Sequence, residues 1–477
     1  MRFAILYFTF MSIAAHAENL YIGLTARGSR IEAAASGDSG PTVVLIEGLN
    51  GRTESAKLAL RKNLRKKKIR LLTIALANPD GTKLVFPPAG VAYRDNPESH
   101  ALWRWIAMQA PDLVLIPGED FGLAEALSKN PPDVGAIRVA KELPKNIPPS
   151  PAHREIERRV ARSPRELADE LGPYYGHDFT DPVYIQAVAL IAQLRLGNLA
   201  EMERLASPYA DGSKNSLARP TSPTLAGHLI FAELAERTHD LRYVDLVRKV
   251  ADLGFTPDGQ MKESMPLHDE MSDSVFMACP ILVKAGKLTG EQKYFDMAAR
   301  HYRFMANLDL RSDGIYRHSP LSDAAWGRGN AFPALGLALT LADFPKNHPD
   351  YPALLLAYQK HLTALSRVQD AEGMWHEIVD EPASYAEFSA TAMIATAMHI
   401  GIRNGWLDAH SYEPRVDRAW QAINKRVGGS GRLLDVCEST GKQKNAADYL
   451  RRAAIWGPDP RGGAMALLFS TEMAGLK

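Results

Sequence analysis

Two aspartates stand four residues apart in an otherwise apolar stretch, LHDEMSDSVFMACPIL. If a helix begins at Pro266, a residue suited to the first helical position, Asp269 and Asp273 share its inner face with Met277. Apolar surroundings favour the neutral form of a carboxyl, which is the form that a general acid needs near neutral pH. A structural alternative also fits, because Asp273 or Ser272 could cap a helix that begins nearby. The stretch therefore predicts a protonatable carboxyl without excluding a helix cap.

A second group of polar residues lies in DGIYRHSPLSDAAWGRGNAF. His318, Trp326 and Arg328 are side chains of the kind that hold an anionic sugar, since arginine pairs with a carboxylate and tryptophan covers an apolar ring face. A tight turn between two helices, with the arginine paired to a helix end, explains the same residues. Both interpretations stay open on the residues alone.

The composition narrows the classes of partner. The chain has 477 residues, of which 46% are hydrophobic and 23% charged, and its formal net charge is +1. So small a net charge offers no field to hold nucleic acid or a membrane surface. The one basic run, RKNLRKKKIR, is expected to be the exposed side of an amphipathic helix. We therefore expect no nucleic acid and no membrane as partners.

The first 17 residues have the pattern of a signal peptide. They combine an early arginine, an apolar run too short to span a bilayer, and a small-x-small sequence that ends at Ala17. Cleavage there would start the mature chain near Glu18, in the periplasm or outside the cell. The two cysteines, Cys279 and Cys437, are too few for a disulfide framework, and we expect buried free thiols.

The elements that must position these residues fall into two regions. Between residues 41 and 142, the apolar runs TVVLIEG, IRLLTIAL, DLVLIPG and VGAIRVA predict buried strands, with helices between them at 53–67, 97–108 and 121–128. This alternation is typical of an α/β domain with a parallel sheet. A proline-rich segment at about 145–160 marks the domain boundary.

Helical periodicity recurs from about residue 160 to the end, with a weak repeat of ~50 residues. Hairpins of that length cannot bury their faces alone, so they must close into a toroid or stack as a solenoid. The predicted fold class is thus multidomain: an α/β domain over 18–150 after the signal peptide, and an all-α domain over 160–477.

Three segments in order, EMSDSVFMACPILVKAGKLTGEQKYFDMAARHY, YRHSP followed by WGRGNAF, and EFSATAMIATAMHIGIRNGWL, resemble the unsaturated uronyl hydrolases of glycoside hydrolase families 88 and 105. The resemblance implies a six-hairpin (α/α) toroid, no metal or cofactor, and an oligosaccharide substrate that ends in an unsaturated uronic acid. It implies Asp273 as the catalytic residue, and it implies a substrate-binding set of Asp269, Met277, His318, Trp326, Arg328 and Phe332.

The implied chemistry suits these residues, because protonation of the substrate's vinyl ether needs one carboxyl, whereas an ordinary glycosidase needs two. This sequence departs from the family where a second aspartate usually begins a helix, having Thr221, Ser222 and Thr224 there, and it has Phe332 where the family has tryptophan. Two alternatives therefore stay open. One is a hydrolase of saturated glucuronides with Asp269, Glu270 or Glu387 as the second carboxyl, and the other is a carbohydrate-binding protein without catalysis.

The first domain has a resemblance of its own. VVLIEGLNGRTES, ALANPDGT, FPPAGVAYRDNPESHALWRWI and PDLVLI are similar to the zinc carboxypeptidase fold. Asn50 stands at the first histidine's place, and no His-x-x-Glu pair is left to close around a zinc ion. We therefore expect a degenerate, metal-free domain that packs on the toroid, with Trp103 and Trp105 on different faces of one helix.

Overall fold

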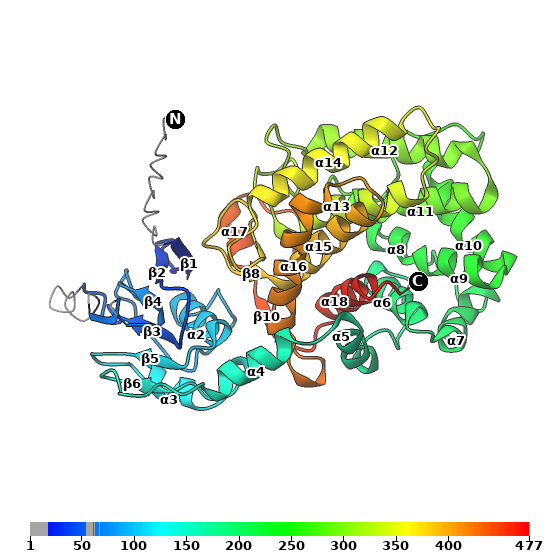
Figure 1. Ribbon diagram of the computed structural model, residues 1–477. Helices are drawn as coiled ribbons and strands as arrows, with labels where there is room; N and C mark the ends of the chain where they lie inside the picture. Colours follow the sequence, from blue (N-terminus) through cyan, green and yellow to red (C-terminus); the bar gives the residue numbers. More distant parts are fainter. Residues whose placement is uncertain (1–17, 54–60, 62, 66, 477) are drawn as a thin grey trace, which may run out of the picture.

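The computed structural model describes residues 18–53, 61, 63–65 and 67–476 (Figure 1). The predicted signal peptide and most of the predicted helix at 53–67 lie outside the described residues. In Figure 1 a sheet domain, in blue, lies beside a larger helical domain, in green to red, and helix α4 (Pro151–Val160) runs between them. Of the described residues, no helix combines the length and the hydropathy needed to cross a bilayer.

The sheet domain is built on six described strands in the order β1-β2-β4-β3-β5-β6. The strands are β1 (Glu18–Leu24), β2 (Arg30–Ser36), β3 (Thr42–Ile46), β4 (Arg70–Ile74), β5 (Leu113–Leu115) and β6 (Val139–Ala140). Strands β4, β3, β5 and β6 run parallel, as predicted, while β1 and β2 add an antiparallel edge that the sequence did not predict.

Both faces of the sheet are covered, which is why its central strands are continuous apolar runs. Val44 and Ile46 pack with residues of α2 (Pro97–Gln109) and α3 (Leu123–Ser128), both predicted as helices. Val43 and Leu45 face the other side, against Leu64.

The helical domain contains an inner ring of six described helices, each in contact with the next until the last meets the first. They are α6 (Tyr184–Arg195), α8 (Ser222–Gly227), α11 (Ser274–Thr289), α13 (Gly327–Asp343), α15 (Phe388–Arg403) and α18 (Pro460–Met473). An outer layer packs on them: α5 (Pro164–Leu171), α7 (Leu199–Ala210), α9 (Leu229–Thr238), α10 (Leu241–Ala251), α12 (Gln292–Asp309), α14 (Tyr351–Arg367) and α16 (Ala409–Arg426). This closed double ring agrees with the toroid that the family resemblance implied.

Short elements lie between the inner helices. Strands β7 (Trp375–His376) and β8 (Ala386–Glu387) form one hairpin, and β9 (Leu433–Cys437) and β10 (Ala454–Gly457) form another that encloses α17 (Ala446–Leu450). Four 3-10 turns complete the described secondary structure: Pro131–Asp133, Gly172–Tyr174, Asp252–Gly254 and Gly429–Gly431.

Side chains of the two domains meet along α2. The Nη1 of Arg104 lies 2.5 Å from Oδ1 of Asp435, and both side chains are buried. The rings of Trp103 and Trp456 meet edge to face at 5.6 Å, because Trp103 reaches beyond its own helix to β10. A charged pair and an aromatic pair therefore hold this contact.

Candidate active site

Asp273 sits at the start of α11, which begins at Ser274 and not at Pro266 as the spacing predicted. Leu267, Asp269 and Glu270 all have left-handed φ angles, of 68°, 49° and 53°, which no helix accommodates. The prediction that Asp269 and Asp273 share one helical face was therefore wrong, and Asp269 is exposed in a loop. The carboxyl of Asp273 occupies the helix-capping position without making a side-chain cap hydrogen bond, so it is not used as a cap.

The carboxyl of Asp273 faces His318. Oδ1 of Asp273 is buried, has no hydrogen-bond partner among the described residues, and lies 3.4 Å from Nε2 of His318. Nδ1 of His318 is 2.8 Å from the hydroxyl oxygen of Tyr449, a residue that the sequence did not single out. The three side chains therefore lie in a row, with a hydrogen bond between His318 and Tyr449, and Asp273 can exchange a proton with His318 once their 3.4 Å separation shortens.

Ser272 fixes the position of this row of side chains. Its hydroxyl donates to the carbonyl oxygen of Gly329 at 2.7 Å, and its backbone N–H donates to the carbonyl oxygen of His318 at 3.0 Å. One serine thereby ties the start of α11 to both segments of the second motif. The sequence also allowed Ser272 to be a helix cap, but in the structure Ser272 makes these tertiary hydrogen bonds.

Trp326 and Arg328 come together at the start of α13. The indole N–H of Trp326 donates to Oε1 of Glu377 at 3.0 Å, and the Arg328 guanidinium lies 4.9 Å from the Trp326 ring centre. Nη1 of Arg328 donates to the Ser389 hydroxyl and to the carbonyl oxygen of Cys437. Nε and Nη2 of this buried arginine have no partner in the described part of the chain, so two donor nitrogens remain for a carboxylate.

Two buried glutamates flank Arg328, one with a raised pKa and the other used as a helix cap. Burial raises the pKa of Glu377 to about 8, and the charge of Glu387 adds to the shift, so Glu377 is largely protonated at neutral pH. Glu387 accepts hydrogen bonds from the backbone N–H groups of Ala390 and Cys437 and caps α15. These hydrogen bonds give Glu387 a structural role. The guanidinium of Arg328 lies 3.9 Å from Glu387, and its pKa is raised because burial, which lowers it, is outweighed by the neighbouring acidic groups.

The remaining predicted site residues lie in the wall of the ring. Met277 and Phe332 are 2% and 1% exposed, and the Phe332 ring packs edge to face on Tyr184 at 5.4 Å. His318 and Trp326 are 0% and 1% exposed, whereas the Asp273 side chain keeps 14% of its surface. Asp273 is thus more accessible than the buried residues that surround it.

Asp309, at the last position of α12, is a second carboxyl that the sequence did not reveal. It is fully buried, and neither of its carboxyl oxygens has a hydrogen-bond partner among the described residues. Burial raises its pKa to about 8, Arg317 counteracts that shift, and the charge of Asp273 adds to it. A protonated carboxyl therefore lies within electrostatic reach of Asp273.

The segment between β9 and β10 covers this site. Tyr449 of α17 contacts His318, and its hydroxyl also accepts the backbone N–H of Gln443 at 3.1 Å. Nζ of Lys442 lies 3.4 Å from Oε2 of Glu270 in an exposed pair, which contributes little to stability. The cover is therefore fixed at Tyr449 and weakly held at Lys442.

The described residues contain no group of three or more histidine, cysteine, aspartate or glutamate side chains placed to hold a metal ion. Glu47 of the sheet domain pairs with Arg61, and the Asn50 side chain accepts the backbone N–H of Arg52. Cys279 and Cys437 are buried free thiols, as predicted.

The model of glycosyl hydrolase family 88 matches residues 153–477, which is well over half of the chain. The protein belongs to glycosyl hydrolase family 88. The match leaves the sheet domain outside, so its resemblance to zinc carboxypeptidases stays a prediction.

Curated relatives share a part of the chain. An unsaturated rhamnogalacturonyl hydrolase of Bacillus subtilis is 32% identical over 200 residues, which cover 39% of this chain and 56% of the relative. An unsaturated 3S-rhamnoglycuronyl hydrolase of an Alteromonas strain is 28% identical over 178 residues, covering 34% of this chain and 42% of the relative. The chain thus spans about half the length of the curated relatives it matches.

Solved structures share the fold. A possible glycoside hydrolase family 105 member from Salmonella enterica superposes with a TM-score of 0.54 at 22% identity, covering 70% of this chain and 97% of that one. A family 105 glycoside hydrolase from C. acetobutylicum gives a TM-score of 0.56 at 21% identity, over 66% and 99% of the two chains. Both matches support the helical architecture.

Proposed function

We propose that this protein hydrolyses unsaturated uronyl residues at the non-reducing end of oligosaccharides, with Asp273 as acid and base. The observation that carries the proposal is the buried, unpartnered Oδ1 of Asp273 beside His318 in a member of glycosyl hydrolase family 88. A buried polar atom without a partner is uncommon in folded proteins and often marks a place for ligand.

The chemistry follows from a vinyl ether and one carboxyl. Asp273 gives its proton to the alkene carbon of the unsaturated uronate, which leaves an oxocarbenium-like cation on the ring. Water adds to the cationic carbon while the carboxylate of Asp273 takes back a proton. The hemiketal so formed opens and releases the remaining sugar. The hydrogen-bonded pair of His318 and Tyr449 lies beside Asp273, and His318 can exchange a proton with it once their separation shortens.

Arg328 is proposed to bind the uronate carboxylate through its free Nε and Nη2 groups. Because this contact exists before and during the reaction, it should lower KM more than it raises kcat. Trp326, His318, Met277 and Phe332 are proposed to shape the pocket. Asp269, being exposed in a loop, is proposed to act at the rim of the site.

The loss of the alkene's ultraviolet absorbance tests this proposal. Purified protein is incubated with unsaturated oligosaccharides released by pectin and glycosaminoglycan lyases, alongside Asp273→Asn and the control Asp258→Asn, which changes an exposed turn outside the site. We expect wild type and the control to remove the absorbance and Asp273→Asn to leave it. If all three proteins are equally inert on every oligosaccharide, the chain is better described as a carbohydrate-binding protein without catalysis.

Asp309 favours a second candidate, the hydrolysis of saturated glucuronides. That reaction needs a protonated acid and an ionised carboxylate on opposite sides of the bond. Of the partners expected from the sequence, Asp269 is exposed in a loop, Glu270 pairs with Lys442, and Glu387 is occupied as a helix cap. Asp309, which the sequence did not reveal, is buried, has no hydrogen-bond partner among the described residues and is largely protonated at neutral pH. Release of nitrophenol from a nitrophenyl glucuronide, lost in Asp309→Asn, would establish this reaction.

The domains and the destination of the chain complete the proposal. We place the sheet domain at 18–150 and the toroid at 160–477, and we assign the sheet domain the role of packing on the toroid through contacts such as Arg104 with Asp435. We also propose export after cleavage behind Ala17. Amino-terminal sequencing of the protein from a secreting host should then begin at Glu18.

A further inference from the structure

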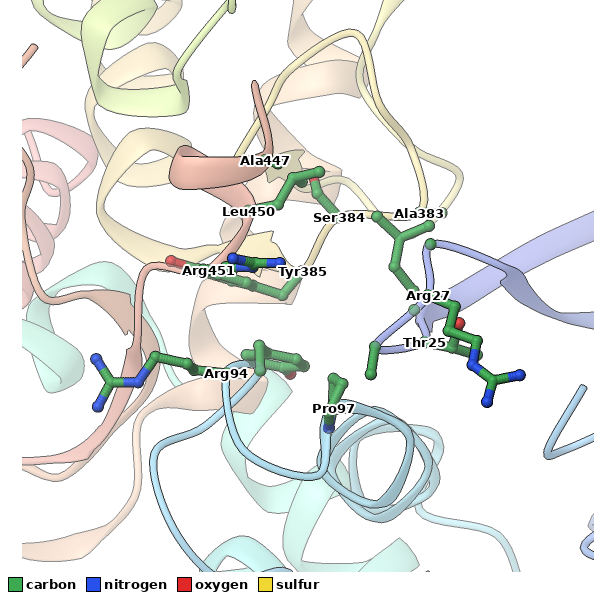
Figure 2. A pocket seen from close by; sticks show the side chains of 15 residues that line it. Thr25, Arg27, Arg94, Pro97, Ala383, Ser384, Tyr385, Ala447, Leu450 and Arg451 are labelled. Atoms are coloured by element: carbon green, nitrogen blue, oxygen red, sulfur yellow. The ribbon is translucent and has the colours of Figure 1, made fainter. Parts of the chain in front are cut away.

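A cavity of about 580 Å³ lies between the two domains, within the size range of small-molecule sites. The sheet domain contributes the turn between β1 and β2 together with Tyr93, Arg94 and Pro97. The helical domain contributes Ala383, Ser384 and Tyr385 from the loop before β8, and Ala447, Leu450 and Arg451 around α17. Figure 2 shows side chains from both domains around the cavity, with Tyr385 and Arg451 near the centre of the view.

The charged side chains that line this cavity are all positive, while the acidic groups of Asp80 and Glu98 lie against the turn that carries Arg27. Three arginines line it, namely Arg27, Arg94 and Arg451, and no aspartate or glutamate is among its described lining residues. Arg27 and Arg451 form no ion pair with any described residue, and Arg94 has only a 4.0 Å contact with Asp95. In the view of Figure 2, Arg27 and Arg94 extend to opposite sides, with Arg451 and Tyr385 between them.

Hydrogen bonds and an aromatic contact hold the backbone around the cavity, while the three arginine side chains are exposed. The hydroxyls of Thr25 and Ser29 donate to the two oxygens of Asp80 at 2.5 and 2.8 Å, and the backbone N–H of Ala26 donates to Glu98, so the turn that carries Arg27 is braced from below. Tyr93 and Tyr385, one from each domain, stack at 4.7 Å with 12° between their planes. The cavity therefore has an aromatic wall and a cationic rim.

Helix α17 connects the cavity to the candidate active site. Its Tyr449 contacts His318, while the neighbouring Leu450 and Arg451 line the cavity. A sugar chain that reaches Asp273 and extends past α17 would thus meet the arginines with residues distant from the reacting bond.

We propose that the cavity between the domains binds an acidic sugar residue, carboxylated or sulfated, from the part of the oligosaccharide remote from the cleaved bond. Arg451 and Arg27 supply the charge-assisted hydrogen bonds, and the tyrosine pair offers apolar contact to the sugar ring. The inference rests on the proposed function for its ligand class, but it uses none of the residues that carry out the reaction.

The test uses the full chain carrying Asp273→Asn, and it measures affinity by titration calorimetry. The probes are trigalacturonate, its fully methyl-esterified form, and a sulfated galactan trisaccharide without carboxylates. Arg451→Ala and Arg27→Ala are compared with Arg452→Ala, the adjacent arginine that does not line the cavity and lies 4.0 Å from Glu438. Thermal unfolding of each variant checks that it is folded.

We expect Arg451→Ala to weaken the binding of an acidic probe at least tenfold, Arg27→Ala to weaken it severalfold, Arg451→Lys to restore part of it, and Arg452→Ala to leave it unchanged. The acidic probe that binds more tightly identifies the acid group as carboxylate or sulfate. Equal binding of the neutral ester, unchanged binding in both cavity variants, or an equal loss in Arg452→Ala would overturn the proposal.

This outcome is separable from that of the proposed function. Hydrolysis of an unsaturated disaccharide by wild type, and its loss in Asp273→Asn, reports on the active site alone. Charge-dependent binding without any hydrolysis would support the proposed cavity site and contradict the proposed reaction. Hydrolysis with charge-independent binding would support the reaction and contradict the cavity site.

Discussion

Asp112 in the sheet domain and Asp273 in the helical domain are both well-enclosed carboxylates, but their oxygens have different surroundings. Asp112 is 2% exposed, and its oxygens accept the backbone N–H groups of Thr42 and Ser150 at 2.8 and 3.2 Å and contact His153 at 2.9 Å. Oδ1 of Asp273 has no partner in the described chain and faces a histidine at 3.4 Å. The carboxyl group of Asp112 stabilises the fold through its hydrogen bonds, whereas that of Asp273 remains available for a reaction.

The same contrast extends around each residue. Near Asp273, unpartnered buried atoms also occur on His318, Arg328 and Asp309. Around Asp112, the backbone of β3 and the start of α4 are satisfied by the carboxylate itself. Since buried polar atoms are nearly always hydrogen-bonded, the group of exceptions around Asp273 indicates a place where a polar ligand would bind. Substitutions in the two places should therefore separate activity from stability.

The largest expected effect is on activity in Asp273→Asn. The amide keeps the shape of the carboxyl but cannot transfer the proton, so kcat should fall by about 10² to 10⁴. Because Oδ1 makes no hydrogen bond to any residue that the structure describes, the unfolding temperature should stay close to that of wild type. Initial rates from alkene absorbance and a thermal melt measure the two quantities. A variant that keeps its activity would assign the proton transfer to another group.

The second expected effect is on stability in Asp112→Ala. Its removal leaves the N–H groups of Thr42 and Ser150 buried without acceptors, which should lower the free energy of unfolding by about 2 to 4 kcal/mol. The variant that remains folded should keep the kcat of wild type, because the change lies in the other domain. Chemical denaturation monitored by tryptophan fluorescence gives the stability. An equal loss of kcat at temperatures where the variant is folded would contradict the contrast.

Sequence patterns predicted the fold better than they predicted the site. The apolar runs of β3, β4 and β5 and the helical repeat carry a periodic signal that depends on neighbours in the chain, and these elements appeared where expected. The start of α11 was predicted wrongly. Residues 267, 269 and 270 have left-handed φ angles and form a turn, although Pro266 is a residue typical of a helix start. The local spacing of residues therefore predicted a helical face at Asp269, where the chain forms no helix.

The partners of the site were hidden for a different reason. Tyr449 reaches His318 from 131 positions away, and Asp309 ends a helix of the outer layer. Nothing in the sequence near either residue distinguishes it from an ordinary surface tyrosine or a helix-terminal aspartate. Their roles depend on burial and on long-range contacts, which only the closed ring creates.

The third expected effect is a change in the pH dependence of stability in Asp309→Asn. The pKa of Asp309 is raised from the ordinary 3.8 to about 8, so between these values the folded protein binds more protons than the unfolded chain. Stability is therefore lost as pH rises through this window, by on the order of 1 kcal/mol per pH unit for one fully shifted group. The asparagine variant lacks this contribution, whereas Glu377 contributes in the same direction in both proteins.

Free energies of unfolding at pH 5, 6, 7 and 8 measure this effect. The difference between Asp309→Asn and wild type should move in favour of the variant with each step. Asp313→Asn, at an exposed turn near the same helix end, serves as the control and should give a difference that is nearly constant with pH. A difference that is constant with pH in both variants would mean that Asp309 is ionised in the folded protein. Asp309 would then no longer support the contrast between the surroundings of Asp273 and those of Asp112.

The smallest expected effect is that of metal removal on the sheet domain. Zinc prefers a closed set of nitrogen, sulfur and carboxylate ligands, but Glu47 is paired with Arg61 and Asn50 stands where a zinc carboxypeptidase would need histidine. Protein purified without chelator should contain well under one zinc per chain by elemental analysis, and dialysis against a chelator should leave its unfolding temperature unchanged. Adding zinc to Arg61→Ala, in which Glu47 is released from its ion pair, sharpens the test, because one freed carboxylate without histidines should still not bind zinc tightly. Stoichiometric zinc in the wild type, lost together with stability on chelation, would show that this domain holds a functional metal and does more than pack on the toroid.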